Sequence, residues 1–86
     1  MADTRDARVA ELARQVRARR KTLGLRQGEL ADLAGCSERF VYSLEQAKST
    51  VQLAKTLDVL RVLGLDLEVV PGSGNFVTRP STETTT

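Results

Sequence analysis

The chain of 86 residues has no histidine and no tryptophan, and its only cysteine is Cys36. Without histidine it lacks the commonest general base and metal ligand, and a single cysteine cannot form an intramolecular disulfide. We therefore expect no enzyme activity, no metal site and no cofactor. A free cysteine is usually buried and inert, so we expect Cys36 to lie in the core.

Aromatic residues are also scarce, and Phe40, Tyr42 and Phe76 are the whole set. The core must then consist of Leu, Val and Ala, as in small helical domains. At this length such a core is marginal for one chain, which favours a dimer. No apolar run is long enough for a signal peptide or a membrane span, so we expect a soluble, cytoplasmic protein with no membrane partner.

Residues 27–46 have the pattern of two short helices joined by a tight corner. Gly35 stands where the chain must turn with positive φ, and Ser37 is a suitable N-cap for the second helix. Each helix has one apolar face at helical spacing, formed by Leu30, Ala31, Leu33 and Ala34 in the first and by Phe40, Val41 and Leu44 in the second. The pattern predicts a helix-turn-helix whose second helix reads DNA.

The charge distribution favours the same function. Residues 1–26 carry eight basic and three acidic side chains, a net of +5, whereas residues 27–50 sum to −2, residues 51–70 to −1 and residues 71–86 to zero. A basic helix beside a reading helix attracts a phosphate backbone. A plain helical hairpin would leave this one-sided charge unexplained.

Gln27, Ala31, Gly35, Val41 and Leu44 stand at the spacings seen in the Cro and phage-repressor (XRE) superfamily, which this stretch therefore resembles. The resemblance implies an all-α, four-helix lambda-repressor-like domain that binds double-stranded DNA in the cytoplasm, at the bacterial nucleoid.

The flanking segments complete the predicted organisation. Residues 1–8 should be frayed, residues 9–64 form the helix-turn-helix domain, residues 65–70 form a strand, and residues 71–86 form a disordered tail. The first helix should run from about Asp6 to Thr22, with a buried stripe of Val9, Leu12 and Val16 that Leu23 extends. Residues 49–52 resemble a capping box that starts a fourth helix, apolar on nearly all sides, which should be buried by its own domain and by a partner.

Residues 65–70 alternate apolar and acidic side chains, with Leu65, Leu67 and Val69 on one face. Such a strand has no partner of its own type within the chain. The simplest solution is the same strand of a second copy, paired antiparallel across a two-fold axis. We therefore expect a homodimer on a palindromic operator.

The base-reading candidates lie on the exposed side of the second helix of the motif: Ser37, Glu38, Arg39, Tyr42 and Ser43. Arg39 is the strongest, because a guanidinium can bridge guanine O6 and N7. Glu38 has three open readings: it accepts from a cytosine amino group, it restrains Arg39, or it assists the helix as a first-turn acid.

By resemblance, Gln27 should bind a phosphate and brace the reading helix, and four further residues match backbone-contacting positions, namely Arg17, Arg26, Gln46 and Lys48. Arg26 stands where the superfamily usually has a Ser or Thr N-cap, which forfeits about 1 kcal/mol of capping. Arg20 and Glu45 match a pair that the superfamily often joins as a salt bridge between its first and third helices.

The sequence LGLDLEVV after the fourth helix resembles the HipB-like antitoxins, whose short strand pairs with the dimer mate. This resemblance implies the antitoxin of a type II toxin–antitoxin pair, which represses its own operon and binds a HipA-like kinase toxin. The alternative is a stand-alone regulator, such as a phage-type repressor or a restriction–modification controller. Phe76 in the tail is either a solvated residue or an anchor in a toxin pocket.

Overall fold

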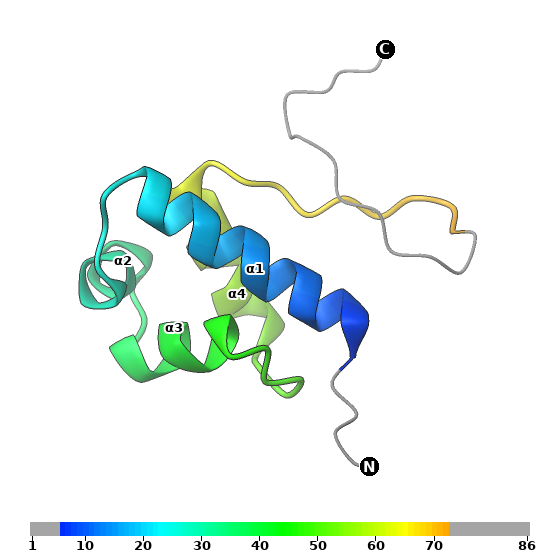
Figure 1. Cartoon of the computed structure of the whole chain (residues 1–86), viewed down its shortest axis with the longest axis horizontal. Helices are drawn as coiled ribbons and strands as arrows, with labels where there is room; N and C mark the ends of the chain where they lie inside the picture. Colours follow the sequence, from blue (N-terminus) through cyan, green and yellow to red (C-terminus); the bar gives the residue numbers. More distant parts are fainter. Residues whose placement is uncertain (1–5, 73–86) are drawn as a thin grey trace.

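The computed structural model describes residues 6–72, and these form four helices: α1 (Ala7–Thr22), α2 (Gln27–Ala34), α3 (Glu38–Glu45) and α4 (Leu53–Leu63). In Figure 1, α1 lies across the bundle, and residues 65–72 lead away from it after α4. Helix α2 packs against α3 and α4, and α1 packs against the same two helices. The described residues confirm the all-helical, four-helix prediction.

The predicted first helix is confirmed at both ends. Asp6 is its N-cap and accepts the backbone N–H of Arg8 over 2.8 Å. Helix α1 begins at Ala7, and the predicted domain boundary at residue 9 stays a prediction. Gly35 ends α2 with a φ of 76°, and the next N–H, that of Cys36, bonds to the Ala31 carbonyl, so the corner of the motif is as expected.

Eight buried side chains from all four helices make one core: Val16, Leu30, Ala31, Val41, Leu44, Val59, Leu60 and Leu63. Two of the predicted apolar positions are wrong, since Leu23 is 45% exposed and Leu33 is 63% exposed. Gly24 turns the chain after α1, so that Leu25, and not Leu23, packs on the core. The side of α2 that faces the core carries Leu30, Ala31 and Ala34. Successive residues of a helix are rotated by about 100°, so Leu33 points well away from the middle of that side.

The predicted capping box at residues 49–52 is also wrong. Helix α4 begins at Leu53, its N-cap is Gln52, and no side chain caps it. Val51 packs against the core and Gln52 has an extended backbone, with ψ of 130°, which delays the start of the helix. The Thr56 hydroxyl donates to the Gln52 carbonyl over 2.8 Å, and this bond leaves the first N–H groups of the helix without a side-chain cap.

Helix α4 buries one side in the domain and leaves a second apolar side open. Its inward residues are Thr56, Val59, Leu60 and Leu63, whereas Leu53 and Leu57 are 62% and 43% exposed. The covering of this open side by a partner stays a prediction.

Residues 65–70 contain no strand within the described part of the chain, and the predicted pairing with a second copy stays a prediction. Leu65 still packs on the core, and its N–H bonds to the Leu60 carbonyl. Leu67 and Val69 are exposed, Val69 almost completely. Phe76 and the tail from residue 73 onward lie outside the described residues. No helix among residues 6–72 is long and apolar enough to cross a membrane.

Candidate nucleic-acid interface

Helix α3 divides its side chains between the core and the surface. Val41 and Leu44 are fully buried and set the depth of the helix in the domain. The Ser37 hydroxyl accepts the Phe40 N–H over 3.0 Å, as an N-cap should. This bond confirms Ser37 as the cap and occupies an acceptor site of its hydroxyl, so the geometry favours a structural role over base reading.

The other predicted readers differ in exposure. Glu38, Arg39 and Tyr42 lie on the exposed side of α3, whereas Ser43 is half-buried. The Arg39 side chain makes no hydrogen bond or ion pair with any other residue of the range 6–72, so its guanidinium is available to a ligand. The structure thus presents one uncommitted guanidinium in the first turn of the reading helix.

A buried polar network joins three helices behind the reading helix. Arg20 of α1 donates from Nε to Glu45 Oε2 over 2.7 Å and from Nη2 to Oε1 over 3.0 Å. The Gln27 amide of α2 donates to the same Oε1 over 3.1 Å, and Arg20 Nη1 donates to the Leu25 carbonyl. These bonds raise the pKa of the Arg20 guanidinium, since Glu45 stabilises its charged form.

This network contains the Arg20–Glu45 pair that the resemblance implies, and adds Gln27 to it. The side chains of Arg20 and Glu45 are only 11% and 2% exposed, so the pair fixes α1 against α3 in a setting where water screens it little. Because its amide donates to Glu45, Gln27 braces α2 against α3. Its second amide hydrogen has no partner in the described part of the chain.

The start of α2 is capped differently from the superfamily pattern. Residue 26 supplies no side-chain cap, but the Glu29 carboxylate accepts the backbone N–H of Arg26 over 2.8 Å. Glu29 was not predicted as part of the cap, although an acid three residues after the N-cap is a recognised signal. The Arg26 side chain is therefore free to extend from the exposed N-terminus of α2.

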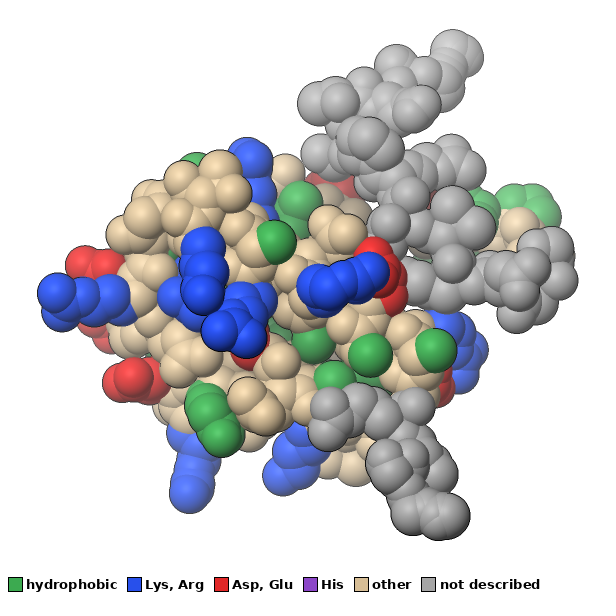
Figure 2. All heavy atoms as spheres, viewed as in Figure 1, with side chains coloured by type: hydrophobic (Ala, Val, Ile, Leu, Met, Phe, Trp, Pro, Cys, Tyr) green, Lys and Arg blue, Asp and Glu red, His purple; other side chains and the backbone are tan. Residues whose placement is uncertain are grey.

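The predicted phosphate-contacting residues Arg17, Arg26, Gln46 and Lys48 are all exposed. Within residues 6–72, none of the three cations Arg17, Arg26 and Lys48 pairs with an acid. Other basic residues of α1 are committed internally: Arg14 pairs with Glu11, and Arg19 donates to the Leu63 carbonyl. Figure 2 shows Lys and Arg side chains at several places on the visible face, and one group lies between the regions that α1, α2 and α3 occupy in Figure 1.

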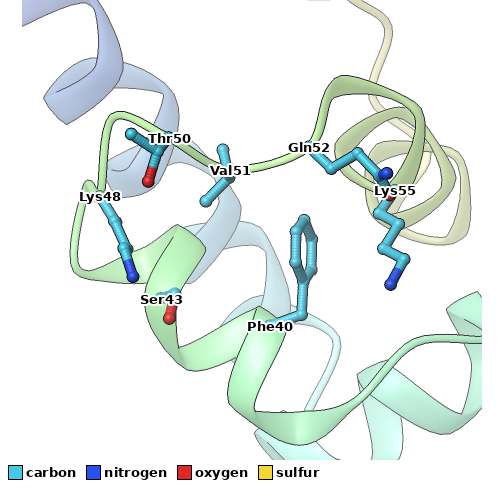
Figure 3. A pocket seen from close by; sticks show the side chains of 7 residues that line it. All are labelled: Phe40, Ser43, Lys48, Thr50, Val51, Gln52 and Lys55. Carbon is cyan, nitrogen blue, oxygen red and sulfur yellow. The ribbon is translucent and has the colours of Figure 1, made fainter.

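An open hollow of about 300 Å³ lies where α3, the following turn and the start of α4 meet; its lining is Phe40, Ser43, Lys48, Thr50, Val51, Gln52 and Lys55. Figure 3 shows Lys48 and Lys55 on opposite sides of it, with the Phe40 ring between. Two cations around an apolar floor suit a sugar-phosphate backbone. Lys55 and Thr50 were not predicted, because only the turn of the chain at buried Ala47, with φ of 63°, brings them beside α3.

The comparisons with known proteins agree with this geometry. A helix-turn-helix domain family matches residues 11–71, and the chain belongs to that family. An uncharacterised HTH-type transcriptional regulator, y4mF of Sinorhizobium fredii, is 44% identical over 64 residues, which are 73% of this chain and 84% of the relative. A solved structure named MDT Protein has a TM-score of 0.69 at 19% identity, with 85% of this chain and 100% of that chain covered, and it shows the fold alone.

Proposed function

We propose that the protein is a sequence-specific, double-stranded-DNA-binding transcriptional regulator that acts as a repressor. The observation that carries this proposal is the uncommitted Arg39 on α3, a helix fixed to α1 and α2 by the Arg20–Gln27–Glu45 network. Support also comes from the helix-turn-helix family and from the name of the rhizobial relative.

In this proposal α3 lies in the major groove with its N-terminal turn toward the bases. Arg39 bridges O6 and N7 of a guanine, and Tyr42 and Ser43 contact the next base pairs. Arg17, Arg26, Gln46 and Lys48 hold the flanking phosphates and set the register. The buried network holds α3 at a fixed angle, so its side chains reach the bases without rearrangement.

The unit that binds DNA in this proposal is a homodimer. Residues 65–70 of two copies pair antiparallel, with Leu65, Leu67 and Val69 on the shared face. Exposure of Leu67 and Val69 in the single chain supports this pairing, since an apolar edge in water gains from a partner. Two α3 helices then contact palindromic half-sites about 34 Å apart.

One experiment tests the DNA-binding proposal directly. A randomised duplex library is passed over the purified full-length protein, and the enriched sequence is measured against a scrambled duplex by fluorescence anisotropy over a salt series. We expect a palindrome, bound at least about 10³-fold more tightly than the scrambled duplex. Failure to enrich any sequence would overturn the proposal.

Deletion of residues 65–86 should weaken both dimerisation and operator affinity, and a truncated protein that stays dimeric would place the interface elsewhere.

We further propose that the regulator is the antitoxin of a type II pair and binds a HipA-like kinase toxin while repressing its own operon. The resemblance of LGLDLEVV to the HipB-like strand supports this role. The measurement is co-elution of the protein with the product of its neighbouring gene. A neighbour that is not a kinase, or that elutes separately, favours a stand-alone regulator. Phe76→Ala should weaken the toxin complex and leave operator binding unchanged.

A further inference from the structure

The Glu38 carboxylate lies against the first turn of α2. Its Oε1 is 3.3 Å from the position that a Cβ on Gly28 would occupy, its Cδ is 3.6 Å away and its Oε2 is 4.0 Å away. The carboxylate thus lies on the side of Gly28 where a side chain would otherwise stand. The side chain bends back toward α2, although it stands in the exposed first turn of the reading helix.

This position excludes one of the three roles considered for Glu38. Within residues 6–72, Glu38 forms no ion pair with Arg39 or any other cation, so it does not restrain the reader. Its carboxylate lies beside the N-terminal end of α2, where the helix dipole favours a negative charge and where residue 26 supplies no side-chain cap.

The position also places a negative charge within the proposed DNA-binding surface. Gly28 follows Gln27, an expected phosphate contact, and Glu38 precedes Arg39, the expected base reader. A DNA strand that approaches the start of α2 meets this carboxylate in addition to the cations around it. A like-charge contact of this kind raises specificity where it costs more binding free energy in the wrong complex than in the correct one.

We propose that Glu38, which lies beside Gly28, is a specificity-determining residue that suppresses binding to non-cognate DNA. This inference rests on the proposed DNA-binding function. Gly28 leaves room for the carboxylate here, since a Cβ on it would stand 3.3 Å from Glu38 Oε1. In this proposal the guanine contact of Arg39 holds the operator so that its phosphates stay clear of Glu38, whereas duplexes that Arg39 cannot read bring their phosphates close to the carboxylate and are repelled.

The test compares Glu38→Gln with wild type on two probes, the duplex that wild type enriches from a randomised library and a scrambled duplex of equal length. Glu38→Gln keeps the shape of the side chain and removes its charge. We expect about three- to tenfold tighter binding to the scrambled duplex at low salt, a salt slope steeper by about one, and a lower specificity ratio. Asp58→Asn is the matched control, since it removes the same charge from α4, where Asp58 pairs with Arg61, and should leave the ratio unchanged.

Two outcomes with Glu38→Gln contradict the proposal. Unchanged affinity for both duplexes would make Glu38 a solvated residue. A loss on the enriched duplex alone would make it a direct reader of a cytosine amino group. In both cases wild type still binds its enriched duplex specifically, whereas failure of the DNA-binding function itself appears as no enrichment by wild type.

Discussion

Arg19 donates from Nε to the backbone carbonyl of Leu63 over 2.8 Å and so ties the last turn of α1 to the last turn of α4. A guanidinium at a helix C-terminus satisfies a carbonyl that has no partner inside the helix and complements the helix dipole. Arg19 therefore differs in function from Arg17, two residues before it. Both belong to the basic segment in sequence, but only Arg17 is uncommitted in the described part of the chain.

We expect Arg19→Ala to lower the free energy of unfolding by about 1 kcal/mol, because a charge-assisted hydrogen bond between helices is lost. Chemical denaturation measures this change. Arg17→Ala is the matched control and should unfold at the wild-type denaturant concentration. Equal stability of the two variants would mean that the Arg19–Leu63 bond contributes nothing.

Arg17→Ala and Lys48→Ala should weaken binding to every duplex to a similar extent. A phosphate contact carries no sequence information, so the specificity ratio should stay constant while the slope of log K against log salt falls by about one in each variant. Anisotropy titrations at four or five salt concentrations measure the slope. A variant with the wild-type slope lies outside the footprint.

Arg39→Ala should lose roughly 1–3 kcal/mol on the enriched duplex and bind the scrambled duplex almost as wild type does. The loss arises because the bidentate contact to one guanine disappears. A duplex in which that guanine is replaced should be bound equally by the variant and by wild type. A loss of similar size on both duplexes would instead make Arg39 a phosphate contact.

Arg20→Met should destabilise the fold on the order of 3 kcal/mol, because it leaves the almost fully buried Glu45 carboxylate without its charged partner. Chemical denaturation measures the loss. Stability equal to that of wild type would show that Glu45 finds another partner.

Cys36 is half-buried, not fully buried as predicted, and burial raises the pKa of its thiol. The folded protein should therefore react with iodoacetamide at pH 8 more slowly than the protein in guanidinium. With a pKa raised in the folded state, this group stabilises the fold below about pH 9 and loses that contribution as the pH rises further. Equal alkylation rates in the two states would contradict the shift.

Periodicity predicted the α1, α2 and α3 helices and most of the core, because the inward positions of an amphipathic helix repeat every three or four residues. Leu33 shows the limit of the pattern: in a helix of eight residues, one leucine can fall beside the buried sector and still match the spacing. The start of α4 was missed since the packing of Val51, and not a local signal, decides it.

The candidate site was predicted in its residues more than in its contacts. Ser37, Arg39 and the Arg20–Glu45 pair occupy positions that a motif can mark. Three relationships could not be predicted because each joins residues from different helices: the Arg19–Leu63 bond, the position of Glu38 beside Gly28 and the position of Lys55 near Phe40. The sequence around each residue does not indicate which partner it meets.

The separation of the two sides of α3 has a consequence for how this protein can evolve. Val41 and Leu44 hold the helix in the domain, whereas Arg39 and Tyr42 face solvent and contribute little to the core. Substitutions at the solvent-facing positions cost little folding free energy, so a lineage can acquire a new operator without first losing its fold. Duplicated copies of such a gene can therefore diverge into regulators that no longer bind each other's promoters.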